Sequence, residues 1–211
     1  MTDPLLTLVQ WLSPAFPVGG YAYSHGLETV IARQEIRTAA GLSDWLSAIL
    51  RWGAARTDAI LLAHALAPGQ DIMALAETAK ALAPSQERLL ETMEQGRAFL
   101  ATTNALTGQK WPPMPYPVAV GAAAAGLGVA SEQVLRLYLH AFASNLVQGA
   151  VRFVPMGQTD GQAVLQGLHG AIAEVAAEAV DAPLSALGAG VLRADLAAMQ
   201  HETMDVRIFR T

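Results

Sequence analysis

The sequence predicts an all-α fold, a single-domain bundle of roughly eight to ten helices with a short C-terminal tail. Along most of the chain, apolar residues recur at steps of three and four, which is the period of one helix face. Proline and glycine divide this pattern into segments of helical length. The alternation typical of a strand is confined to Val206-Arg207-Ile208. We therefore expect helices to dominate the chain.

The first half of the chain divides into short helices. Asp3 before Pro4 suits a helix start, because an aspartate side chain caps the first amides and proline fits the first turn. Ser13-Pro14 ends this helix, and a loop extends to Gly20. Apolar residues at helical spacing then place further helices around residues 27–31, 42–50, 58–66 and 71–83.

A longer amphipathic helix is expected after Pro84. Charged side chains usually occupy the solvent-exposed face of such a helix, so we place its apolar residues inward and its acidic residues outward. The expected inward residues are Leu89, Met93 and Leu100, and the expected outward residues are Glu87, Glu91 and Glu94.

The Pro-rich connection 111–117 is the one clear linker, because its four prolines forbid a helix there. Beyond it, the alanine- and glycine-rich segment 117–127 should let helices pack closely. Each half of the chain shows too few helices to fold alone. We therefore expect one domain over residues 1–211.

The second half should contain longer helices. Ser131 is expected to cap a helix that ends at Pro155, and Thr159 with Gln162 fits a capping box that opens the next one. That helix is expected to end at residues 181–183. A last helix over 195–203 and a tail over 202–211 should follow it.

The composition excludes several classes of function. Charged residues make up only 15% and hydrophobic residues 53%, so part of the apolar surface should be covered by another subunit, and we expect a homodimer. The net charge is -5 and the arginines are scattered, which argues against nucleic-acid binding. The chain has no cysteine, and this excludes disulfides, thiolate catalysis and cysteine-based zinc sites.

We expect a cytoplasmic protein without a membrane span. The N-terminus lacks the basic region and apolar block of a signal peptide. The apolar stretch 118–130 is broken by glycines and is shorter than the roughly 20 residues that a spanning helix needs.

The sequence lacks a phosphate-binding P-loop and contains one segment that is similar to a catalytic motif. A phosphate-binding P-loop needs a glycine before its lysine, but Lys80 and Lys110 follow other residues. Ala22-Tyr23-Ser24-His25-Gly26 is similar to the nucleophile elbow of serine hydrolases, which requires a preceding strand. Here a loop precedes it, so Ser24 is interpreted as the cap of the following helix. A serine hydrolase using Ser24 remains the alternative function.

The five histidines offer little metal-binding pattern, because no two stand at the i,i+4 spacing that grips a metal on one helix face. Residues 201–205 approach a zinc-binding H-E-x-x-H pattern, with Asp205 in the second ligand position. His201 is therefore the one weak metal candidate.

The C-terminal tail combines Phe209 with Arg207 and Arg210, an aromatic anchor between guanidinium groups. This composition is enriched at binding hot spots. A frayed terminus is the other interpretation that composition allows. The loop 152–162 also contains several polar residues. Their identity is not explained by the need to end one helix and start the next.

Three segments taken together resemble the family of urease accessory proteins UreF. The first, residues 13–28, is similar to that family's N-terminal signature of Ser-Pro, Pro-Val-Gly and Gly-Leu-Glu. The second, residues 152–162, is similar to its Arg-x-Val-Pro-x-Gly-Gln-Thr-Asp-Gly-Gln. The third is the tail, with His201-Glu202-Thr203 followed by residues 207–211. The three matches occur in order along the chain.

The resemblance implies an all-α homodimer that assembles with the accessory protein UreD (also called UreH) and the GTPase UreG. It implies that this complex delivers nickel to apo-urease. The chain itself would recruit and modulate the GTPase without catalysis of its own. No stably bound cofactor is implied, and nickel would be at most transient. A helical scaffold unrelated to urease is a further alternative.

The resemblance also implies which residues contact partners. The tail residues would contact UreD, and residues of the other two segments would lie near the dimer interface or face the GTPase. The expected UreD contacts are His201, Glu202, Arg207, Phe209 and Arg210, and the others are Gly19, Ser24, His25, Glu28, Arg152, Gln158, Asp160 and Gln162.

Overall fold

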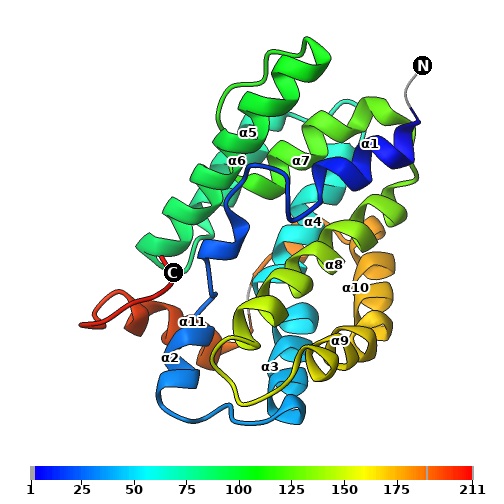
Figure 1. Cartoon of the computed structure of the whole chain (residues 1–211). Coiled ribbons are helices and arrows are strands. Elements are labelled where there is room, and N and C mark those ends of the chain that lie inside the picture. The colour runs from blue at the N-terminus through cyan, green and yellow to red at the C-terminus, as the bar shows by residue number, and fades with distance from the viewer. Residues whose placement is uncertain (1–2, 189, 211) are drawn as a thin grey trace.

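A computed structural model describes residues 3–188 and 190–210, and this part of the chain is helical with no β-strand (Figure 1). The all-α prediction is confirmed. The tail's last residue, Thr211, lies outside the described residues. The α-helices are α1 (Pro4–Trp11), α2 (Leu27–Ala32), α3 (Ala39–Trp52), α4 (Ala54–Leu66), α5 (Ile72–Ala81), α6 (Gln86–Thr107), α7 (Tyr116–Ala124), α8 (Ser131–Ala150), α9 (Gln158–Gly167), α10 (His169–Asp181) and α11 (Leu192–His201).

The core forms around α4 and α7. Residues 117–124 of α7 are all buried. A side chain at Gly121 would lie 2.5 Å from the Cβ atom of Ala65, so the glycine permits the close approach of α7 to α4. The same core cluster includes Leu42, before the Pro-rich connection 111–117, and Val147, after it. One core therefore spans both halves of the chain. Among the described helices, none is long and apolar enough to cross a membrane.

Several helix ends differ from the predictions. Ser131 is the first residue of α8 and makes no capping bond, and α8 ends at Ala150, before Pro155. The predicted capping box is wrong, because α9 starts earlier, after Gly157. Asp160, not Gln162, accepts the hydrogen bond from the Gly157 amide, at 3.0 Å. The shorter aspartate side chain reaches this amide from the third helical position.

The last two predicted helices also change. The helix expected from residue 159 to 181 is divided into α9 and α10 at Leu168, whose amide bonds to the carbonyls of both Val164 and Leu165. Glycine at 167 favours this break, because it is a poor helix former. α11 begins at Leu192 rather than 195 and ends at His201. Val206 and Ile208 form bends, and residues 206–208 contain no strand.

The predicted orientation of α6 is wrong at its acidic residues. Glu87 and Glu91 are buried and Glu94 is half-buried, whereas of the predicted inward residues only Leu100 is buried. Both buried carboxylates are paired with guanidinium groups, Glu87 with that of Arg207 in the tail and Glu91 with that of Arg88 in α6 itself. Such pairing allows a carboxylate to be buried despite the cost of removing it from water.

Gly26 allows α2 and α11 to pack side by side, as Figure 1 shows for the N- and C-terminal parts of the chain. Its φ of 76° lies in the left-handed region. A Cβ atom there would lie 2.7 Å from the backbone nitrogen of Ala198. Only glycine fits both constraints.

We expect Gly26→Ala to lower the free energy of unfolding by at least about 2 kcal/mol, because it combines a left-handed backbone penalty with a backbone clash. Urea unfolding followed by circular dichroism measures this. Gly69→Ala is the matched control, since Gly69 also has a positive φ but nothing within 4 Å of its added Cβ. Equal losses in the two variants would contradict the packing explanation.

Candidate functional site

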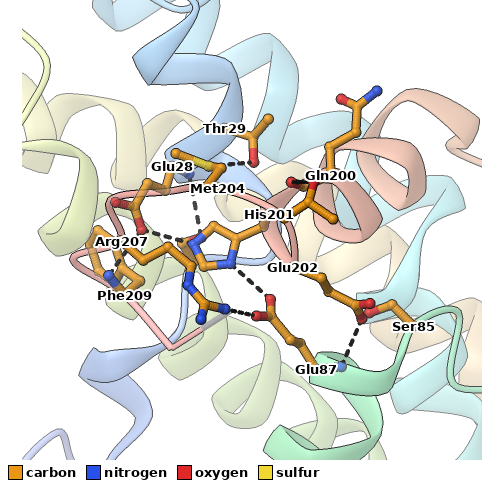
Figure 2. Close-up of polar contacts among 12 residues, drawn as sticks. Glu28, Thr29, Ser85, Glu87, Gln200, His201, Glu202, Met204, Arg207 and Phe209 are labelled. Atoms are coloured by element: carbon orange, nitrogen blue, oxygen red, sulfur yellow. Dashed lines mark hydrogen bonds and ion pairs between the residues drawn. The ribbon is translucent and has the colours of Figure 1, made fainter.

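His201, the last residue of α11, is completely buried between two carboxylates (Figure 2). Its Nε2 lies 2.9 Å from a carboxylate oxygen of Glu28 in α2, and its Nδ1 lies 2.7 Å from one of Glu87 in α6. Both ring nitrogens of His201 therefore have a carboxylate oxygen within hydrogen-bonding distance.

The same two carboxylates hold the tail. Glu28 accepts hydrogen bonds from the backbone amides of Ile208, at 2.8 Å, and Phe209, at 2.9 Å. Glu87 accepts a bond from the guanidinium of Arg207, at 2.6 Å (Figure 2). Hydrogen bonds to charged groups are about twice as strong as those between neutral groups. Glu28 and Glu87 thus fix the tail to α2 and α6.

Glu202 contributes a further bond at the start of α6. One of its carboxylate oxygens accepts the backbone amide of Glu87, at 3.0 Å. Amides in the first turn of a helix lack partners within the helix, and a negative charge is favourable there. The side chain of Glu202 thereby supplies a partner from the far end of the chain.

Phe209 joins the tail to the loop 152–162. Its ring packs edge-on against Phe153, with centroids 5.4 Å apart, and a Cβ atom at Gly149 would lie 3.3 Å from it. Arg210 donates its backbone amide to the carbonyl of Ala22, at 2.7 Å. The three segments 13–28, 152–162 and 201–210 therefore meet in one place.

The remaining predicted residues fall into two groups. Ser24 is buried, and His25 is largely so, with 11% of its side chain exposed. Gly19 is half-buried and has a φ of 72° just before a short 3₁₀ helix, Gly20–Ala22. In the other segment, the four predicted residues are all exposed to solvent: Arg152, Gln158, Asp160 and Gln162.

A buried polar cluster that the sequence did not predict lies behind this site. Arg88 and Glu91 form an ion pair within α6, and Nε2 of His25 lies 3.0 Å from Glu91. Asp58 of α4 accepts a hydrogen bond from the hydroxyl of Tyr138, at 3.0 Å. These residues line a cavity of about 50 Å³, which has room for water.

Burial and charge change the titration of this cluster. Burial raises the pKa of Asp58 to about 6, although Arg88 and the Tyr138 hydroxyl oppose the change. Burial also works to raise the pKa of Glu91, but the charges and hydrogen bonds of Arg88 and His25 outweigh it and lower that pKa to about 2. For His25, burial and the nearby Arg88 charge lower the pKa. The cluster therefore keeps one firmly ionised carboxylate beside one that is readily protonated.

Comparison with known proteins identifies the family. The UreF family model matches residues 36–169, more than half of the chain. The chain belongs to the UreF family. The urease accessory protein UreF of Cereibacter sphaeroides (strain ATCC 17025 / ATH 2.4.3) is 62% identical over 211 residues, covering 100% of both chains. That of Dinoroseobacter shibae is 54% identical over 206 residues, 98% of each chain, and that of Methylobacterium sp. (strain 4-46) is 46% identical over 224 residues, 98% of this chain and 88% of the relative.

Ser24 of this UreF-family chain does not have the geometry of an elbow serine. It is 1% exposed, and its Oγ accepts a hydrogen bond from the backbone amide of Glu28, at 3.3 Å. Within the described residues no strand precedes it. The N-cap residue of α2 is Gly26 and not Ser24 as predicted, although the Ser24 side chain supplies a partner for an amide in the first turn of this helix.

His201 is not placed as a metal ligand. Its two ring nitrogens are hydrogen-bonded to carboxylates that lie on different sides of the ring, so Glu28 and Glu87 do not converge on one point (Figure 2). In the part of the chain that the structure describes, no group of three or more His, Cys, Asp or Glu side chains could hold a metal ion.

We expect Glu28→Gln to loosen the tail, because an amide group offers only one acceptor oxygen to three donors. A loss of about 2 kcal/mol would speed hydrogen exchange at the amides of Ile208 and Phe209 about 30-fold. The control is Glu174→Gln, which removes an exposed ion pair with Arg51 on another part of the surface. Unchanged exchange at both amides would contradict the role of Glu28.

We expect the ionisation of Asp58 to lower the free energy of unfolding as the pH rises. Its pKa is about 6 in the folded chain against 3.8 ordinarily, so the folded state holds the proton more tightly between these values. Asp58→Asn does not titrate there and should gain on the order of 2 kcal/mol relative to the unmodified chain between pH 4 and pH 7. Thermal unfolding across this range measures the difference. Parallel stability curves would show that Asp58 titrates normally.

Proposed function

We propose that this chain is a urease maturation factor that binds UreD (UreH) and the GTPase UreG. In this role it modulates the GTPase and assists nickel insertion into apo-urease, as a cytoplasmic homodimer with no stably bound cofactor. The observation that carries the proposal is the identity of 62% over the full length of a protein named urease accessory protein UreF.

The outer face of the tail is the proposed docking surface for UreD. Val206 is 77% exposed and Ile208 66%. The side chains of Arg207 and Arg210 are 44% and 65% exposed, although each bonds to a glutamate of α6. Aliphatic side chains beside guanidinium groups suit a protein interface. We assign Arg207, Arg210 and Glu202 to direct contact.

His201, Phe209 and Glu28 have a different proposed role. His201 and Glu28 are buried, and Phe209 is only 9% exposed, so a partner cannot reach them while the tail is docked. They support the surface from beneath by fixing the path of residues 202–210. Preorganising a binding segment in this way lowers the entropic cost of association.

The exposed residues of the loop 152–162 and α9 are proposed to face the GTPase or the dimer partner. The side chains of Arg152, Gln158 and Gln162 are exposed to solvent and are therefore available to a partner. Asp160 is partly committed, since it caps α9. Ser24, His25 and Gly19 are proposed to fix the conformation of segment 13–28 rather than to contact a partner directly.

We expect the double variant Arg207→Ala, Arg210→Ala to weaken UreD binding at least about 100-fold, because two arginine hot spots of about 2 kcal/mol are removed. In a strain lacking its own copy of this accessory gene, the unmodified chain should restore urease activity and urease nickel content, and the variant should not. Arg136→Ala is the control, since Arg136 is also exposed but lies in α8, paired with Glu132.

The outcomes separate the alternatives. Failure of the unmodified chain to restore urease activity would favour a scaffold unrelated to urease. Restoration by the double variant, with undiminished UreD binding, would refute the tail as the docking surface while leaving the maturation role in place.

A further inference from the structure

Two histidines from distant parts of the sequence lie side by side on the surface. His140 stands in the middle of α8, and His169 is the first residue of α10. Their ring centroids are 5.6 Å apart and the ring planes are inclined by 48°. The packing of α10 against α8 brings them together. Their separation of 29 positions hides the pair from any search for metal-binding spacing along a single helix.

Neither histidine has a structural task in hydrogen bonding. Of the other histidines, His25 lies against Glu91, His64 against the carbonyl of Ala182, and His201 between two carboxylates. Within the described residues, His140 and His169 make no hydrogen bond or ion pair and contact each other only through their rings. His169 is exposed and His140 half-buried, so solvent and small ions can approach.

An imidazole binds a metal through a ring nitrogen that carries no proton. No other described side chain hydrogen-bonds to either ring, so both histidines have nitrogens available for a cation.

The separation of the rings suits a shared ion. Metal–nitrogen bonds of about 2 Å place the centroids of two imidazoles on one tetrahedral ion about 5 Å apart. The observed 5.6 Å is within reach of this value by small side-chain rotations. Imidazole ligands favour borderline divalent transition metals such as Zn²⁺, Cu²⁺ and Ni²⁺ over Mg²⁺ and Ca²⁺.

We propose that His140 and His169 together form a two-histidine site for a borderline divalent transition metal ion. Water fills the other coordination positions, because the described residues place no third ligand of the His, Cys, Asp or Glu type there. A site with two protein ligands exchanges its ion easily. The proposal goes beyond the role in urease maturation and does not depend on it, since it rests only on the two side chains.

The test is calorimetric titration of the purified full-length chain with ZnCl₂ at pH 7.5 in a buffer that does not bind metals. We expect one equivalent of Zn²⁺ to bind. The variants His140→Gln and His169→Gln should each weaken that binding at least tenfold. His64→Gln is the matched control and should bind like the unmodified chain, because His64 is engaged with the carbonyl of Ala182.

Two further measurements keep the test independent of folding. Zn²⁺ should raise the melting temperature of the unmodified chain and not that of the two variants, because a ligand of the folded state stabilises it. In the unmodified chain, the imidazole NMR signals of both His140 and His169 should shift together during the titration. The absence of saturable Zn²⁺ binding, shifts at other histidines instead, or unweakened binding by either variant would overturn the proposal. None of these results would alter the outcome of the complementation experiment.

Discussion

The C-terminal part of this protein depends on one interaction, the pairing of a buried histidine with two buried carboxylates. His201 has no exposed surface, so each of its ring nitrogens needs a partner within the protein. Glu28 and Glu87 provide those partners and are themselves buried. An unpaired carboxylate in either position would be costly, so the three groups stabilise one another only as a set. The set connects α2, α6 and α11. Glu28 and Glu87 can accept further hydrogen bonds, and those bonds, from the amides of residues 208 and 209 and from Arg207, fix the path of the tail.

The helices could be predicted from periodicity because each helix carries its own apolar stripe. α6 was the exception, since its acidic residues were placed outward by the rule that charge faces water. The rule failed because both partners of Glu87, His201 and Arg207, lie far away in the sequence. Glu91 has one distant partner, His25, besides Arg88 of the same helix. Periodicity within one helix contains no information about such partners. A signal was nevertheless present: Glu87, Glu91 and Glu94 follow one another at steps of four and three, so they share one face of the helix.

The candidate site shows a similar division. Resemblance to the UreF family selected three segments that the fold brings together, through Glu28 with the amide of Phe209 and through Phe209 with Phe153. It could not separate residues that shape the site from residues that form its surface. That distinction requires the burial of each side chain, which follows from the packing of α11 against α2 and not from the local sequence. The cluster of Asp58, Arg88 and Tyr138 was missed for the same reason, because its members come from three different helices.

The dependence of Glu28 and Glu87 on the tail has a consequence for biosynthesis. Glu28 and Glu87 are translated well before their partners, since His201 follows them by 173 and 114 residues and Arg207 follows Glu87 by 120. Until those partners have been made, α2 and α6 contain two carboxylates that cannot be buried at acceptable cost. The region around α2 and the first turn of α6 therefore closes only when His201 and Arg207 are available, and a chain truncated before His201 leaves it open. Folding of this surface thus has to wait for the synthesis of residues 201–209.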